Sequence, residues 1–333
     1  MKKALITGIS GQDGSYLAEF LLNKGYEVHG LVLRVEMEDT ERSLWRISHL
    51  MDKITLHPAS VESYPSLFRV FEHVQPDECY HLAAASFVNY SFDEEFTIFN
   101  VNVAGTHNVL SAIKECAPGC KFYFAGSSEM FGNAESSPQN EDSKFHPRSA
   151  YGITKVTGYF LTQNYRENHG IFACNGILYN HESERRGFEY VTRKITNTAA
   201  KIKLGQATEL RLGNLDAKRD WGYAPDYVEA MWLMLQQPNP EDFVIATGEP
   251  HSVREFVEEA FESVGLEWQK YVISDEKFYR PSEKVLLSGN ATKARRLLEW
   301  QPRVGFHEIV HRMVQADLSL QESKRKNSVT SPG

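Results

Sequence analysis

Four polar side chains between Ser127 and Lys155 have the types and the spacing needed for acid–base chemistry. Ser127 and Glu129 follow the short apolar run KFYFAG, which predicts a buried strand. Tyr151 and Lys155 are one helical turn apart, so a helix that begins near Ser149 would place both on one face. A cation beside the phenol is expected to lower the pKa of Tyr151 toward neutrality. Tyr151 is therefore a candidate base.

Each of these residues also has an ordinary interpretation. The Tyr-x-x-x-Lys spacing recurs at Tyr190 and Lys194, and a solvated helix pair produces the same pattern. Glu129 could be a loop or N-cap carboxylate. The catalytic interpretation of Tyr151 is favoured because Ser127 and Glu129 precede it at a predicted strand end and a glycine-rich loop lies near the N-terminus.

The glycine-rich loop reads GISGQDG over residues 8–14, between the strand pattern ALIT and the helical pattern SYLAEFLLNKG. A dinucleotide site has its parts in this order: the glycines admit the pyrophosphate, and amides at the helix N-terminus meet its charge. The spacing is Gly-x-x-Gly-x-x-Gly, and an ordinary turn between a strand and a helix remains the alternative.

The end of the second predicted strand, EVHGLVLR, bears on the choice of dinucleotide. An arginine at this point favours the 2′-phosphate of NADP, whereas an acid favours the ribose 2′-hydroxyl. Arg34 therefore indicates NADP. Glu36, Glu38 and Asp39 follow closely and could simply pair with it.

Strand and helix patterns alternate as far as Leu178 and predict a Rossmann-type doubly wound parallel sheet. After Leu178 the pattern becomes irregular and cationic, which predicts a smaller C-terminal α/β substrate domain. We predict an NADP-binding domain over 1–178, to which 210–248 returns. The substrate domain covers 179–209 and 249–321, and 322–333 is a mobile tail.

Composition narrows the classes of partner. The chain has 333 residues, of which 41% are hydrophobic, and a net charge of -8, which argues against nucleic acid as a partner. Its four cysteines lack metal-ligand spacing, which indicates reduced thiols in a cytoplasmic protein and no metal site. We find no signal peptide and no apolar span that would indicate a membrane.

Over nearly its whole length the chain resembles the extended short-chain dehydrogenase/reductase superfamily and, within it, the GDP-mannose 4,6-dehydratase family. The motifs that carry the resemblance are GISGQDGSYLAEFLL, SSEMFG, YNHESERRG, VTRKI, LGNLDAKRDWGYAPDYVEAMWLMLQQ, and FVIATG with SVREF. The resemblance implies an NADP-dependent lyase that converts GDP-mannose to GDP-4-keto-6-deoxymannose. The steps are oxidation at C4, elimination of water across C5 and C6, and reduction at C6.

The resemblance also implies roles for individual residues. Ser127 occupies the family's Ser/Thr position, Glu129 the acid/base, Tyr151 the oxidation base and Lys155 its partner. The implied cofactor contacts are Gly8, Ser10, Gly11, Gln12, Asp13, Arg34, Leu82, Ala83, Ala84, Ser86, Val101, Tyr151, Lys155, His181 and Arg186. The implied substrate contacts are Ser86, Glu129, Asn180, Lys194, Arg219 and Arg280. Without the resemblance, His181 could be a core histidine and the cations solvated surface charge.

The chain departs from the family pattern in the loop after Arg34, which reads LRVEMEDTERS where the family has Arg-Arg-Ser-Ser. In family tetramers that loop touches a neighbour's cofactor, so a tetramer is the weaker expectation. We expect at least a homodimer, because the helices predicted to begin near Asn100 and Tyr151 are the pairing faces of the superfamily and both carry apolar stripes. The alternative activities are a GDP-manno-heptose 4,6-dehydratase and a nucleotide-sugar 4-epimerase or reductase of the same scaffold. A non-catalytic nucleotide-binding protein is expected to lack part of the Ser, Tyr and Lys set, which is complete here.

Overall fold

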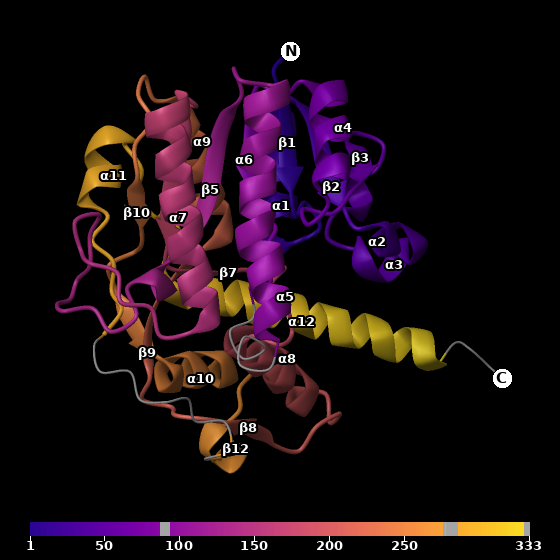
Figure 1. The fold of residues 1–333 in the computed structure, drawn as a ribbon. Coiled ribbons are helices and arrows are strands. Elements are labelled where there is room, and N and C mark those ends of the chain that lie inside the picture. The colour runs from indigo at the N-terminus through magenta and orange to yellow at the C-terminus, as the bar shows by residue number, and fades with distance from the viewer. Residues whose placement is uncertain (87–93, 276, 278–285, 330–333) are drawn as a thin grey trace.

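The computed structural model describes residues 1–86, 94–275, 277 and 286–329, and its centre is a parallel sheet. Seven strands pair in the order β10-β6-β5-β4-β1-β2-β3 (Figure 1). They are β1 (Lys3–Thr7), β2 (Glu27–Val32), β3 (Thr55–Pro58), β4 (Glu78–His81), β5 (Lys121–Ser127), β6 (Ala173–Leu178) and β10 (Phe243–Ile245). The strand order reverses between β1 and β4, where sheets of this kind open a crevice at the carboxyl ends of their strands. The predicted doubly wound sheet is confirmed.

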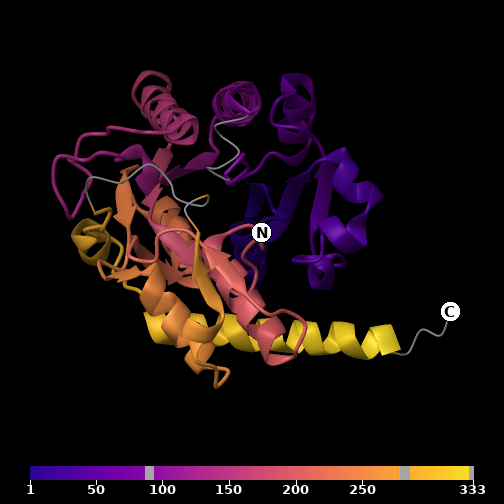
Figure 2. The same ribbon diagram turned by 90° about the horizontal axis from the view of Figure 1, so that it is seen from below.

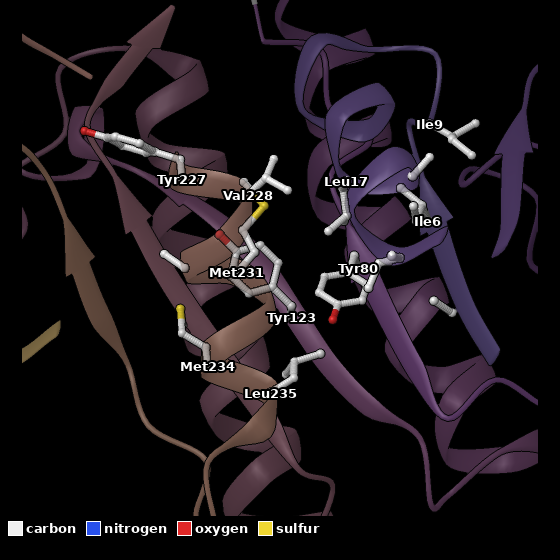
Figure 3. Packing of buried hydrophobic residues seen from close by; sticks show 14 of the residues in the cluster. Ile6, Ile9, Leu17, Tyr80, Tyr123, Tyr227, Val228, Met231, Met234 and Leu235 are labelled. Carbon is white, nitrogen blue, oxygen red and sulfur yellow. The ribbon is translucent and has the colours of Figure 1, made fainter. Parts of the chain in front are cut away.

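Helices cover both faces of this sheet, because alternate residues of each strand point to opposite sides. Ala4 and Ile6 belong to the core on one face, and Leu5 to the core on the other. The first face packs against α1 (Gln12–Asn23), α9 (Ala224–Gln236) and α11 (Thr292–Leu297). The second packs against α4 (Tyr64–Val74), α6 (Gly105–Cys116) and α7 (Ala150–His169). Figure 3 shows Leu17 of α1 and Met231 of α9 beside Tyr80 and Tyr123 of the sheet.

Shorter helical segments join these elements. They are α2 (Arg34–Glu38), α3 (Thr40–Ser43), η1 (Ser48–Leu50), α5 (Glu95–Phe99), η3 (Asn100–Ala104), η4 (Ser128–Met130) and η5 (Trp268–Lys270). The segments α5, η3 and α6 run on from one another. The helix expected to open at Asn100 therefore begins earlier, at Glu95.

A second, smaller unit has its own apolar core. It contains α8 (Val191–Lys203), α10 (Val253–Glu262) and α12 (Phe306–Val329). Its strands are β7 (Asn180–Glu182), β8 (Leu210–Leu212), β9 (Lys218–Tyr223), β11 (Pro250–Ser252) and β12 (Val272–Ser274). Figure 2 shows α12 running beneath this unit and beyond it.

The predicted domain boundaries need correction. Helix α11 was assigned to the substrate domain, but it packs against the main sheet. Of the segment 210–248, only α9 and β10 join the main unit, whereas β8 pairs with β12 and β9 lies between β7 and β11. The reason is that β8 buries Leu210 and Leu212 but exposes Arg211, so it cannot be an inner strand of a sheet covered on both faces.

A last correction concerns the tail, which was predicted to be mobile from Glu322. Helix α12 instead continues to Val329, and residues 330–333 lie outside the described part of the chain. Four of the eight residues of this stretch are Glu, Lys or Arg, which are good helix formers and need little burial. Among the described residues, no helix is long and apolar enough to cross a bilayer.

Candidate active site

A cleft of about 1620 Å³ lies between the carboxyl ends of the sheet strands and the second unit. Nineteen of the residues singled out from the sequence line it. They are Gly8, Ser10, Gly11, Gln12, Asp13, Leu82, Ala83, Ala84, Ser86, Val101, Ser127, Glu129, Tyr151, Lys155, Asn180, His181, Arg186, Lys194 and Arg219. Residues at the carboxyl ends of β1, β4 and β5 thus meet residues of α1, α7 and the second unit at one place, as expected for an open α/β sheet.

The glycine loop forms a cradle that side chains would fill. Gly8 has φ +74°, and a Cβ on it would lie 2.9 Å from the amide nitrogen of Ala83. A Cβ on Gly14 would lie 2.3 Å from the carbonyl oxygen of Gly8. Gly11 is the N-cap residue of α1 and has no side chain that could accept a hydrogen bond, so no capping side chain accepts from the first amides of this helix. The cradle and these amides fit the pyrophosphate of a dinucleotide.

Tyr151 and Lys155 lie on the buried face of α7, beside the end of β5. Ser149 begins this helix by accepting a hydrogen bond from the amide of Gly152 (3.0 Å), which confirms the predicted start. Lys155 is 5% exposed, and its Nζ donates to the carbonyl of Ala125 (2.8 Å). The same Nζ lies 5.7 Å from the centre of the Tyr151 ring. The local structure therefore places a cation next to the phenol.

The expected lowering of the Tyr151 pKa does not occur in this structure. Burial raises the pKa of Tyr151, and Tyr190 and Glu129 add to this, while Ser127 and Arg186 oppose it. Burial also lowers the pKa of Lys155 to about 8, although Asp13 opposes this. The prediction was wrong because spacing shows which groups are neighbours, whereas desolvation, the largest influence on both groups, depends on what covers them.

Glu129 lies on η4, two residues after Ser127 at the end of β5. The amide of Glu129 donates to Oγ of Ser127 (3.3 Å), which fixes the turn that carries the carboxylate to the cleft. A Cβ on Gly152 would lie 2.8 Å from the carbonyl oxygen of Glu129, so α7 approaches this turn closely. Glu129 and Tyr151 therefore face one compartment, where a carboxylate and a phenol can act on neighbouring atoms.

His181 joins the cofactor loop to the second unit. Its Nε2 is 2.8 Å from Oδ2 of Asp13, and its Nδ1 is 2.7 Å from the carbonyl oxygen of Tyr179. Both partners are acceptors, so this geometry favours the protonated ring, in which both nitrogens donate. Burial lowers the pKa of His181, but Asp13 and the Tyr179 carbonyl outweigh it and the pKa is raised. His181, for which a packed core position was the alternative, thus pairs with Asp13 in the cleft.

We expect His181→Gln to destabilise the protein most at low pH. Because the folded-state pKa is raised above its ordinary value of 6.5, the stabilisation is complete below pH 6.5 and is lost as pH rises through the folded-state pKa. The loss should be on the order of 1 to 3 kcal/mol at pH 6. Thermal unfolding of both proteins between pH 6 and pH 9 measures it.

The matched control is His307→Gln, since the His307 side chain is 79% exposed and pairs with Glu259 at the surface. Its effect should be small at every pH. A difference between wild type and His181→Gln that stayed constant from pH 6 to pH 9 would show that the imidazolium is not the stabilising form.

The predicted substrate contacts are partly assembled in the structure. Nζ of Lys194 donates to the carbonyl of Arg211 (2.7 Å), and Arg219 and Asn180 lie on the same wall of the cleft. Arg280 lies outside the described residues. The Tyr190–Lys194 pair, whose spacing had an ordinary explanation, is on the cleft wall as well: the hydroxyls of Tyr190 and Ser86 are 2.9 Å apart.

Arg34, a predicted cofactor contact, does not line the cleft in this structure. Its side chain is 90% exposed and lies 4.0 Å from Glu38. It borders a smaller pocket with Met37 and Pro58, and this pocket shares the lining residues Leu33, Ala59 and Ser60 with the cleft. The pairing with a nearby acid that the sequence left open is the arrangement found, because Glu38 is one turn away on α2.

Three further residues at the site were missed by sequence reasoning. Asn102 accepts from the amide of Ala85 (2.9 Å) and donates to Oγ1 of Thr154 (3.0 Å), so it ties the loop after β4 to α7. Glu36 and Arg46 line the cleft near the glycine loop. Of the three, only Glu36 was noted from the sequence, as a possible ion-pair partner of Arg34. Among the described residues, no group of three or more His, Cys, Asp or Glu could hold a metal ion.

Comparison with known proteins gives one family. The family described as GDP-mannose 4,6 dehydratase matches residues 5–313. GDP-mannose 4,6 dehydratase 2 of Arabidopsis thaliana is 48% identical over 340 residues, covering 100% of this chain and 90% of that protein.

Solved structures of lower identity share the fold. The dTDP-glucose 4,6-dehydratase of Bacillus anthracis, in complex with NAD, is 18% identical with a TM-score of 0.83 and covers 97% of this chain and 98% of its own. RMD of Pseudomonas aeruginosa, complexed with NADPH, is 20% identical with a TM-score of 0.80 and covers 96% of this chain and 100% of its own.

Proposed function

The chain belongs to the GDP-mannose 4,6-dehydratase family, and on that premise we propose that its cleft converts GDP-mannose to GDP-4-keto-6-deoxymannose. The observation that carries the proposal is the meeting of Ser127, Glu129, Tyr151 and Lys155 beside the glycine cradle in one cleft. A dehydratase needs an oxidation base and a separate acid/base. In this cleft the phenol of Tyr151 and the carboxylate of Glu129 are available for these two roles.

The cofactor is a nicotinamide dinucleotide, which we take to be NADP. When bound, it supplies the chemistry that no side chain has, by accepting a hydride from C4 and returning it to C6. The glycine cradle and the amides at the start of α1 would hold its pyrophosphate. Because the hydride that leaves also returns, the sugar loses one water without net oxidation.

The first step assigns Tyr151 to the O4 proton. Tyr151 removes the O4 proton as the C4–H bond breaks. Ser127 stabilises both the phenol and the developing carbonyl oxygen. Burial favours neutral Tyr151, so the base is generated only where a positive charge faces it. Lys155, 5.7 Å from the ring centre, provides that charge below a pKa of about 8.

The second step assigns Glu129 to C5 and C6. A ketone at C4 acidifies the C5–H bond, so a carboxylate can take that proton, and the protonated acid can pass a proton to the C6 hydroxyl as it leaves as water. The hydride would then return from the bound cofactor to C6, and C5 would take up one proton, which balances the O4 proton that Tyr151 removed in the first step.

Direct assay with a panel of nucleotide sugars tests the proposal. The protein is incubated with GDP-mannose, a GDP-linked manno-heptose, UDP-glucose and dTDP-glucose, and products are read by mass spectrometry. Loss of one water from GDP-mannose is the expected result. Loss of water from the heptose alone would support the heptose dehydratase, and epimerisation without loss of water would support the 4-epimerase.

We further propose that the protein is a homodimer paired through α5 and α7. These helices contact one another and expose large apolar side chains, among which Phe96 is 90% and Phe160 55% exposed. Large exposed apolar side chains on two helices in contact favour an interface. The double variant Phe96→Glu/Phe160→Glu is expected to be a monomer by light scattering at micromolar concentration, where wild type is a dimer.

The control for this prediction is Leu297→Glu, which places the same charge on an exposed leucine of α11 and should leave the dimer intact. A wild-type monomer, or a double variant that remains a dimer, would contradict the proposal. A wild-type tetramer that falls to a dimer in Phe96→Glu/Phe160→Glu would support the larger alternative.

We also propose that the protein is located in the cytoplasm. The four cysteines are free thiols, and three of them, Cys79, Cys120 and Cys174, are buried, as suits a reducing compartment. Cell fractionation followed by detection of the protein tests it, and recovery outside the cytoplasmic fraction would contradict it.

A further inference from the structure

Glu36 and Arg46 approach the glycine loop from two sides. Oγ of Ser10 donates to Oε1 of Glu36 (2.6 Å). The guanidinium of Arg46 donates to the carbonyl of Ser10 (3.3 Å) and to the carbonyl of Arg185 (2.7 Å). Strands β1 and β2 are parallel neighbours, so the loops that follow them lie together at the carboxyl edge. In this arrangement the adenosine ribose lies beside the residues after β2.

The position of Glu36 is fixed by the start of α2. Its second carboxylate oxygen, Oε2, accepts from the amide of Leu33 (2.7 Å), which caps the helix. This bond turns Glu36 toward the cleft, while Arg34, two residues earlier, points to solvent and to Glu38. A carboxylate held in this way accepts hydrogen bonds from a ribose 2′-hydroxyl and repels a 2′-phosphate.

Arg46 has the opposite preference. It forms no ion pair with a carboxylate of the described residues, and only backbone carbonyls accept its hydrogen bonds. Burial lowers the pKa of Arg46, and Arg193, Arg186 and Arg185 add to this, although Glu189 opposes it. A partly buried cation with other cations around it gains from a nearby anion, so a 2′-phosphate would be stabilised there.

We propose that Glu36 and Arg46, and not Arg34, discriminate between the 2′-hydroxyl of NAD and the 2′-phosphate of NADP in this chain. The inference rests on the proposed nicotinamide cofactor. Both residues contact Ser10, and they have opposite effects on a 2′-phosphate. The selectivity of the wild type therefore depends on the repulsion of the phosphate by Glu36 and its attraction by Arg46.

The experiment measures which dinucleotide each purified protein retains. Wild type and variants are equilibrated with equal concentrations of NAD and NADP, free dinucleotide is removed, and the retained dinucleotide is released by denaturation and quantified by mass spectrometry. Glu36→Gln should raise the ratio of NADP to NAD at least about tenfold, because a charge beside a phosphate is removed. Arg46→Gln should lower the ratio by a similar factor, and Arg34→Gln should leave it within about twofold.

The outcomes separate this inference from the function on which it rests. Recovery of neither dinucleotide from wild type would overturn the proposed cofactor. Recovery of a dinucleotide, with a ratio unchanged in Glu36→Gln and lowered in Arg34→Gln, would overturn the inference alone. Glu36→Gln suffices even if Arg46→Gln does not fold, since glutamine has the same shape and can still accept from the Leu33 amide and bond to Ser10.

Discussion

Glu129→Gln is expected to stop the loss of water while the first hydride transfer continues. Glutamine keeps the shape of the side chain on η4 but cannot take the C5 proton. The variant should therefore produce the absorbance of the reduced nicotinamide on mixing with GDP-mannose and then release little 6-deoxy product. The expected loss of turnover is on the order of a hundredfold to ten-thousandfold, the usual contribution of a positioned acid/base.

Stopped-flow absorbance and product analysis together measure this effect. Glu135→Gln is the matched control, because Glu135 lies on the loop that follows η4 but its side chain is 75% exposed and pairs with Lys144. That variant should behave as wild type. If Glu129→Gln turned over within a few-fold of wild type, Glu129 would be an ordinary loop carboxylate and a 4-epimerase or reductase would become the better interpretation of the cleft.

Tyr151→Phe should block the reaction one step earlier. Without the phenol, the base assigned to the O4 proton is missing, so the C4 hydride is not released and no nicotinamide absorbance should develop. The expected loss is again on the order of a hundredfold to ten-thousandfold, but here it falls on the first hydride transfer. Phenylalanine fills the same volume, so thermal stability should change little.

Tyr190→Phe is the control for this experiment, since Tyr190 is a second phenol on the cleft wall, 2.9 Å from Ser86. Its loss should raise KM for the nucleotide sugar while the hydride transfer of the bound complex is retained. Equal loss of hydride transfer in both variants would remove the distinction between Tyr151 and Tyr190 and leave the base unassigned.

The sequence by itself determined the sheet, the glycine loop and the positions of Ser127, Glu129, Tyr151 and Lys155. These features follow from local rules. Apolar runs such as KFYFAG bury both faces of a strand, and four-residue spacing aligns side chains on a helix. Parallel strands then bring their carboxyl ends together, so residues far apart in the chain could be assigned to one cleft before any contact was known.

Only the tertiary structure decided which charges of the stretch 34–46 face that cleft. A short helix can present any side to its surroundings, and the capping of α2 by Glu36 turns the acid inward and leaves Arg34 outside. Strand β8 likewise joins β12 because the second unit covers only one of its faces. The pKa of Tyr151 is raised rather than lowered for a similar reason. Desolvation, cap geometry and strand partners depend on what packs against a residue, and a sequence pattern records only which residues are near in the chain.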